Sequence, residues 1–393
     1  MTFRGSDGTP VQLGAVLARA GEGTIYEVAG RGDLVAKVFH PELKSLPVKR
    51  AKVNAMTASV PTGAVQPDGF VVLTWPLHTV SGDDGTTGYV MHRIDTSNSV
   101  EIHTISNPAD RMNPLPSAPQ WTRNATWSHL VNVAANLCLA VQTAHGVDAV
   151  IGDFQERNIL VNDTTRVTLV DCDSMQFTDR AGHQFLCAVG RPEFTAPELT
   201  GIDLATTPRE NPSDLFSLAV HIHLLLMAGN HPFLRGQWTG PGDQPDAMTL
   251  AKSGWWAGGP GSPLLTHPLA PPPSFLPDHI QRLFVRAFTD GAHTPAARPM
   301  FRAPPWSGSS AGLPGLASSR PATSIPWTRF SWRWTVRIPP GGPCTKPRNW
   351  PMPCTPRSLS WPWPSMTTSC RWPSKMRSRP IAASAPTAAP PPT

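Results

Sequence analysis

The segment 150–173 constrains this chain more than any other, because it sets three polar residues among apolar, strand-like runs. Asp153 is followed five residues on by Asn158, and Asp171 lies thirteen residues beyond the asparagine. Phosphoryl transfer from Mg-ATP needs one carboxylate to accept the proton of the attacking hydroxyl and two oxygen ligands for the metal. A lone acid and amide at this spacing also occur in ordinary turns. With the third residue, the segment predicts a metal-nucleotide site.

Two upstream segments fit such a site. Residues 33–39 form an apolar run that contains a single lysine, Lys37. On a strand this ammonium could pair with nucleotide phosphates, although an ordinary edge-strand lysine would have the same sequence. Before it, Gly21 and Gly23 lie in a segment where flexible backbone could bring N–H groups to a phosphate. The glycine signal is weak by itself.

In this order, the motifs resemble those of the protein-kinase fold. The family's H-R-D-x-x-x-x-N corresponds to residues 151–153 with Asn158, and its D-F-G corresponds to residues 171–173. The resemblance implies that Asp153 is the catalytic base and that Asn158 and Asp171 are magnesium ligands. It also implies that Lys37 contacts the phosphates of ATP.

The same resemblance assigns the rest of the nucleotide site. Gly21 and Gly23 lie where the glycine-rich loop is expected, although alanines occupy its first two glycine positions. The last strand of the small lobe and the hinge are expected at residues 88–93. Backbone groups near Met91, His92 and Arg93 would meet the adenine.

Downstream motifs complete the kinase pattern. Residues 196–198 match the A-P-E that ends an activation segment, and Arg298 matches the family's closing R-P signature. Arg298 is therefore expected to pair with Glu198. Asp214 begins an apolar helix of the large lobe, where an acid suits the helix dipole. Two histidines in that helix, His221 and His223, are interpreted as packed core residues.

The resemblance covers about residues 10–299 and is closest to divergent bacterial serine/threonine kinase-like proteins with G-D-x-x-x-x-N and D-C-D-S loops. We expect an α+β, two-lobed fold with a small β-rich lobe over residues 1–95 and a large helical lobe over 96–300. ATP and Mg²⁺ are the implied cofactors, and the implied substrate is a protein hydroxyl. No signal peptide or membrane span is recognisable, so we expect a cytoplasmic protein without membrane contact.

Several departures leave the activity open. Gln155 replaces the catalytic-loop lysine, and we hypothesise that Arg191 supplies the missing charge. Gly152 replaces the arginine that receives a phosphorylated activation loop. No acidic residue occurs between positions 43 and 67, so Lys37 lacks the usual helix glutamate. A nucleotide-binding pseudokinase is one alternative. A small-molecule phosphotransferase is another, although residues 196–198 and Arg298 favour a protein kinase.

The net charge of +6 arises from the C-terminal tail. Asp290 is the last acidic residue, and 12 Lys and Arg residues follow position 300. The tail could bind nucleic acid through its cations and tryptophans, or bind a partner through its prolines. We favour a third interpretation, a frame-shifted translation, because the composition changes directly after Pro299. In each case residues 301–393 are expected to be disordered.

Overall fold

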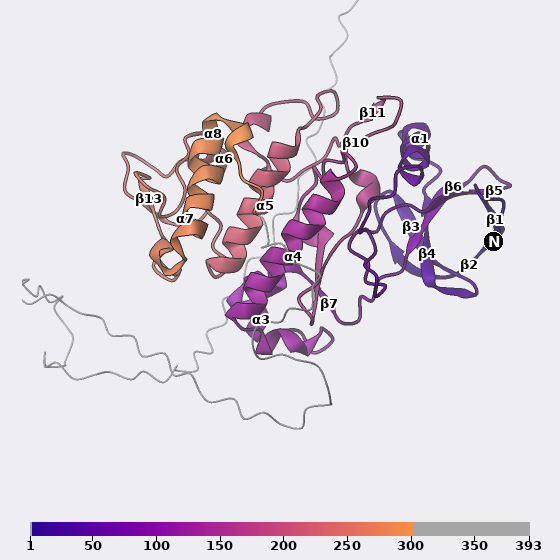
Figure 1. The fold of residues 1–393 in the computed structure, drawn as a ribbon, viewed down its shortest axis with the longest axis horizontal. Coiled ribbons are helices and arrows are strands. Elements are labelled where there is room, and N and C mark those ends of the chain that lie inside the picture. The colour runs from indigo at the N-terminus through magenta and orange to yellow at the C-terminus, as the bar shows by residue number, and fades with distance from the viewer. Residues whose placement is uncertain (1, 302–393) are drawn as a thin grey trace, which may run out of the picture. The chain divides into compact units, whose positions relative to one another are not determined.

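A closed barrel of six strands forms the N-terminal part of the protein (Figure 1). The computed structural model describes residues 2–301. All neighbouring strands are antiparallel and follow the order β1-β2-β3-β4-β6-β5. The strands are β1 (Thr2–Gly5), β2 (Pro10–Arg19), β3 (Gly23–Val28), β4 (Arg31–Phe39), β5 (His78–Gly82) and β6 (Thr87–His92).

Side-chain alternation along β4 separates two apolar surfaces. Leu34, Ala36 and Val38 belong to the barrel core, which also contains Phe3, Val11, Val28, Val80 and Val90. Val35 and Phe39 point to the opposite face, where they pack with Val53 of helix α1 (Leu46–Thr57). Because Lys37 shares the parity of Val35 and Phe39, β4 presents it on the face that α1 covers.

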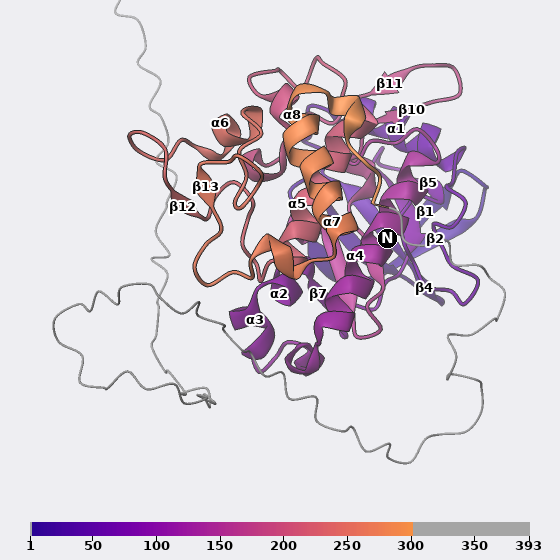
Figure 2. The same cartoon turned by 60° about the vertical axis from the view of Figure 1, so that its left-hand side comes forward.

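The second part of the described chain is built around two long helices, α4 (Trp127–His145) and α5 (Asn211–Leu226). They lie side by side in both views and share one apolar core (Figures 1 and 2). Pro212 and Asp214 occupy the first turn of α5, as suits a helix start. The shorter helices are α2 (Ile102–Ser106), α3 (Pro108–Met112), α6 (Ala247–Lys252), α7 (Asp278–Phe284) and α8 (Gly291–His293).

Short strands carry the segments that follow α4. One sheet has the order β7-β8-β9, from β7 (Ser99–Glu101), β8 (Ile159–Asn162) and β9 (Val167–Leu169). Asn158 comes directly before β8 and Asp171 follows β9, so this antiparallel pair brings the two residues to the same end. Two small hairpins are formed by β10 (Phe177–Thr178) with β11 (Gln184–Phe185) and by β12 (Gln237–Trp238) with β13 (Leu264–Leu265).

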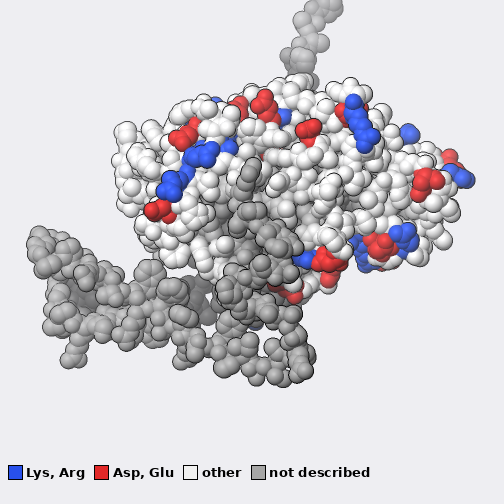
Figure 3. Space-filling view, in the orientation of Figure 1, with Lys and Arg blue, Asp and Glu red and all other residues white. Residues whose placement is uncertain are grey.

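The predicted mixture of helices and strands is confirmed, and the closed barrel is an addition that the sequence did not predict. Within residues 2–301, no helix combines the length and apolarity needed to cross a bilayer. On the described part of the face in Figure 3, Lys and Arg are interspersed with Asp and Glu and form no continuous basic patch. The expected disorder and the interpretations of the tail concern residues that, apart from Phe301, lie outside the described range.

Candidate active site

A cavity of about 970 Å³ is lined by the barrel on one side and by the segment around β8 and β9 on the other. Ile25, Val35 and Met91 give it apolar walls, whereas Lys37 and Asp171 bring charges. The stretch that follows β6, residues 93–97, forms one edge. Such a mixture of apolar walls and a few convergent polar groups is typical of a small-molecule site.

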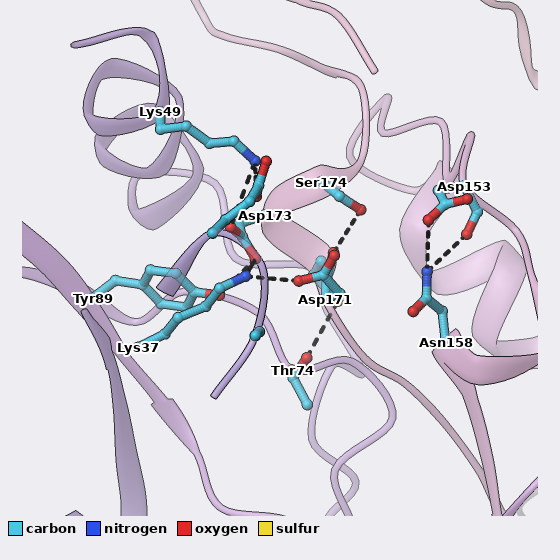
Figure 4. Close-up of polar contacts among 12 residues, drawn as sticks. Lys37, Lys49, Thr74, Tyr89, Asp153, Asn158, Asp171, Asp173 and Ser174 are labelled. Atoms are coloured by element: carbon cyan, nitrogen blue, oxygen red, sulfur yellow. Dashed lines mark hydrogen bonds and ion pairs between the residues drawn. The ribbon is translucent and has the colours of Figure 1, made fainter. Parts of the chain in front are cut away.

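Lys37 lies between two carboxylates at one end of this cavity (Figure 4). Its Nζ is 2.7 Å from Oδ1 of Asp171 and 2.7 Å from Oδ1 of Asp173. Burial disfavours the ammonium charge, but the two carboxylates outweigh it and hold the pKa of Lys37 above its usual range. The Asp171 side chain is 38% exposed and Asp173 is fully buried. Only Asp171 of the two carboxylates lines the cavity.

The pKa values of the two carboxylates shift in opposite directions. Burial raises the pKa of Asp171 against the attraction of Lys37. For Asp173, burial acts in the same direction, but Lys37 and Lys49 overcome it and hold its pKa well below the usual range. The two lysines therefore stabilise the charge of Asp173 more strongly than burial opposes it.

Asp153 is held by two amide side chains. Nδ2 of Asn158 donates to the backbone oxygen of Asp153 at 2.9 Å and to its Oδ2 at 3.2 Å (Figure 4). Nε2 of Gln155 donates to the same Oδ2 at 2.6 Å. Because Asn158 donates through its nitrogen, its Oδ1 stays available as a ligand oxygen. Asn158 lines the cavity together with Asp171.

Asp214 fixes the loop that carries Asp153. Its Oδ2 accepts hydrogen bonds from the amide of Ile151 at 2.7 Å and from Nε2 of His145 at 2.9 Å. Its Oδ1 accepts from the amide of Gly152 at 3.0 Å. Both oxygens of this buried carboxylate are therefore used by the chain itself.

Position 152 requires glycine for two independent reasons, its backbone conformation and the lack of space for a side chain. Its φ of +70° lies in the left-handed region, and a Cβ there would be 2.8 Å from Sγ of Cys187 and 2.9 Å from Nη1 of Arg209. The chain therefore lacks an arginine at position 152 but places the guanidinium of Arg209 over the same loop. The sequence did not predict this contact.

Glu198 and Arg298 form a bidentate pair at the start of α5. Nη1 and Nη2 of Arg298 lie 2.5 and 2.6 Å from the two carboxylate oxygens of Glu198. The guanidinium also donates to the backbone oxygens of Pro212 and Gly291. The Arg298 side chain is completely buried, so this pair ties the segment that contains Glu198 to α5 and to the end of the described chain.

Other predicted residues lie at different places. Met91, His92 and Arg93 line the cavity, and Arg93 also pairs with Glu27 at 3.2 Å. Gly21 lies in the turn between β2 and β3 and Gly23 begins β3, and neither is among the cavity-lining residues. A Cβ at Gly23 would lie 2.5 Å from the backbone oxygen of Val38, so this glycine allows β3 and β4 to approach.

Arg191 does not line the cavity. Its Nη1 lies 3.1 Å from Oε1 of Glu156, the residue that follows Gln155. The arginine therefore reaches the Asp153 loop, but a carboxylate of that loop already balances its charge.

Comparison with known proteins finds relatives that are named as kinases. No family model matches the chain. Two curated relatives, both named Protein kinase YegI, come from Escherichia coli strain K12 and Escherichia coli O157:H7. They are 30% identical over 292 residues and 29% identical over 307 residues, which is 72% and 77% of this chain. Over these residues the chain is similar to bacterial proteins named as protein kinases. The matches cover 42% and 45% of the relatives, so the chain spans less than half their length.

In this kinase-like frame, sequence reasoning missed three contributors to the site. Asp173, Tyr89 and Lys49 surround Lys37, and the Tyr89 hydroxyl donates to Oδ1 of Asp173 at 2.7 Å. As the sequence indicates, helix α1 offers Lys37 no acid; Lys37 pairs instead with Asp171 and with Asp173, and the second of these partners was not predicted. The signals were present: a second acid two residues after Asp171, and a helix rich in lysine without any acid.

The donor set fits a magnesium ion that is bound together with a nucleotide. Asn158 and Asp171 offer oxygen ligands in one cavity, and oxygen is the donor that Mg²⁺ prefers. Among residues 2–301, no group of three or more His, Cys, Asp or Glu side chains could hold a metal. Two protein ligands suit Mg²⁺, which usually completes its shell with water and substrate phosphates.

Proposed function

We propose that the protein is an ATP-dependent protein kinase that transfers the γ-phosphoryl group to serine or threonine hydroxyls. The observation that carries this proposal is the convergence of Lys37, Asn158 and Asp171 on one cavity, with Asp153 bonded to Asn158. The names of the relatives support the kinase assignment. In this proposal, residues 1–95 and 96–300 are the small and large lobes, and the nucleotide binds between them.

Each side chain then has a separate task. The Oδ2 of Asp153, oriented by Gln155 and Asn158, accepts the proton of the attacking hydroxyl. Asn158 and Asp171 would hold Mg²⁺, which when bound with the nucleotide neutralises charge on the phosphates. Lys37 contacts the phosphates from the barrel side.

The adenine would occupy the apolar part of the cavity. Met91 and Val35 flank it, and His92 and Arg93 also line the cavity. The segment with Gly21 and Gly23 would cover the phosphates. Arg191 remains our candidate for the charge absent at Gln155, since its partner Glu156 belongs to the same loop.

The test is phosphoryl transfer by the full chain from γ-labelled ATP with Mg²⁺ to casein or histones, followed by analysis of phosphoserine and phosphothreonine. Asp153→Ala, Lys37→Ala and Asp171→Ala should each lower the rate by at least about 100-fold. Asp163→Ala is the matched control, because this exposed carboxylate lies in the same segment outside the cavity. Its rate should equal that of the wild type.

Two results would replace the proposal by an alternative. Tight binding of Mg-ATP by the wild type without transfer to protein or to itself would identify a pseudokinase. Transfer to choline or an aminoglycoside, with none to protein, would identify a small-molecule phosphotransferase. Unchanged transfer by Asp153→Ala would contradict the assigned base.

A further inference from the structure

Asp173 contacts Lys37 but does not line the cavity. It lies on the turn Cys172–Ser174, two residues after Asp171, and is fully buried. Its Oδ1 accepts hydrogen bonds from Nζ of Lys37 and from the hydroxyl of Tyr89, both at 2.7 Å. Unlike Lys37 and Asp171, it is absent from the cavity lining. Asp173 therefore does not belong to the cavity lining that Asn158 and Asp171 share.

Helix α1, which faces Asp173, is basic and contains no acidic residue. Lys49 of α1 extends toward the carboxylate, with its Nζ 4.0 Å from Oδ2 of Asp173 and 2.5 Å from Oε2 of Glu22 (Figure 4). Glu22 belongs to the turn between β2 and β3. Oδ2 of Asp173 is buried and has no hydrogen-bond partner among residues 2–301. Lys49 is therefore the cation next to this oxygen, and it links α1, the turn and Asp173.

Asp171 and Asp173 would respond differently to a bound nucleotide. Asp171 is partly exposed in the cavity, and a metal at its oxygens would weaken its attraction to Lys37. Asp173 is sealed from the cavity and keeps both of its hydrogen bonds. Lys37 thus retains one counter-charge that does not depend on the ligand.

We propose that Asp173 is the positioning residue of Lys37, in place of an acid on α1, and that Lys49 holds α1 and the β2–β3 turn to the same carboxylate. Compared with a network whose acid lies on α1, the positions of the charges are exchanged. The acid comes from the segment after β9, and a cation comes from α1. Lys37 is then oriented without α1, whereas the position of α1 depends on Asp173 and Glu22. This inference rests on the proposed function, because it assigns Lys37 to the nucleotide phosphates.

The test uses two readouts on the full chain, the Kd for Mg-ATP and the kcat/KM for ATP. Asp173→Asn keeps the shape of the side chain and removes its charge, and should lower both kcat/KM and the affinity for Mg-ATP by about 10- to 100-fold. In a Lys37→Met background the same change should alter the Kd by less than about twofold, because the charge then has no lysine to orient. Equal losses of affinity in both backgrounds would show a merely structural role and overturn the proposal.

A second pair of variants tests the link through α1 without changing the buried acid. Lys49→Met should lower kcat/KM for ATP by about 3- to 10-fold, since the remaining pair of Asp173 and Lys37 is intact. Lys44→Met is the matched control, because this exposed lysine precedes the same helix and forms no ion pair with any described residue. Identical values for Lys49→Met and Lys44→Met would remove Lys49 from the network.

These results separate the inference from the proposed function. If the wild type transfers phosphate and Asp173→Asn does so equally well, only the inference fails. If the wild type binds Mg-ATP without transfer, the Kd comparison in the two Lys37 backgrounds still decides the role of Asp173. A wild type that binds no Mg-ATP overturns both.

Discussion

Two charged clusters of this protein differ in their access to the cavity. The anchor cluster, formed by Asp214, His145, Glu198 and Arg298 around the start of α5, uses its carboxylate oxygens within the chain and does not line the cavity. The cleft cluster, formed by Lys37, Asp171, Asp173, Tyr89 and Lys49, brings Lys37, Tyr89 and Asp171 to the cavity. Each cluster contains one buried polar atom without a hydrogen bond among the described residues, Nε of Arg298 and Oδ2 of Asp173. The anchor cluster is therefore expected to stabilise the fold, whereas the cleft cluster presents charge to the cavity.

The comparison predicts that stability depends on the helical part much more than on the cleft. The largest expected effect comes from three histidines in the core around α5: His221, His223 and His231. Each hydrogen-bonds to a backbone oxygen, and burial lowers their pKa values to about 4, 3 and 4. Below pH 6.5 these histidines bind protons in the unfolded chain but stay neutral in the folded chain. The free energy of unfolding therefore decreases as the pH is lowered.

Between pH 7 and pH 5, each of these histidines should lower the free energy of unfolding by about 2 kcal/mol, or about 6 kcal/mol together. Urea unfolding at the two pH values measures this loss. Replacement of His223 by Gln should remove about a third of the pH dependence, whereas the exposed His183→Gln should leave it unchanged. A free energy of unfolding that stays constant from pH 7 to pH 5 would contradict the assigned neutral core.

The next effect tests the anchor cluster directly. Arg298→Met keeps the length of the side chain but leaves Glu198 and two backbone oxygens without their donor. Loss of one partner of a buried ion pair costs about 3–5 kcal/mol. Arg31→Met is the control, because Arg31 and Asp33 form an exposed pair at 2.8 Å that is screened by solvent, so its loss should leave the midpoint of unfolding close to that of the wild type. Equal midpoints of chemical unfolding for the two variants would show that the anchor cluster does not stabilise the fold.

A smaller loss is expected at the loop that Asp214 holds. Gly152→Ala places a Cβ in the left-handed region and against Cys187 and Arg209, at a cost of about 1–3 kcal/mol. Gly182→Ala has a similar positive φ of +84° but no atom within 4 Å of the new Cβ. The difference between the two variants in unfolding free energy therefore isolates the contact from the backbone strain. Equal destabilisation of the two variants would show that contacts of the new Cβ with Cys187 and Arg209 do not affect the free energy of unfolding.

The sequence predicted the anchor cluster better than the cleft cluster, and the reason is physical. Glu198, Asp214 and Arg298 belong to motifs whose spacing is visible in the chain, and their partners are backbone groups, each other or, for Asp214, the His145 side chain. Asp173 pairs with Lys37 across 136 positions, and this pairing depends on how β4 faces the turn after β9. No local sequence pattern indicates the pairing of these two distant residues.

In the fold, too, local features were predicted from the sequence and long-range contacts were not. The apolar run that begins at Asp214 indicated α5, because such a local pattern depends only on neighbouring residues. The closure of the barrel depends on β1 pairing with β5, from Phe3 with Gly82 to Gly5 with Val80, and was not predicted. The position of Arg209 over Gly152 is a third contact of this long-range kind.

The smallest expected change in stability lies in the cleft, at Asp171. Asp171→Asn should alter the free energy of unfolding by less than about 1 kcal/mol in the absence of nucleotide, because Lys37 keeps Asp173 as its partner. The same variant should lose transfer from Mg-ATP by at least about 100-fold, since an amide is a weaker ligand for the metal. Thermal unfolding and transfer measured on one preparation test both parts. A loss of stability as large as that of Arg298→Met would mean that the cleft cluster is structural, and the contrast between the two clusters would disappear.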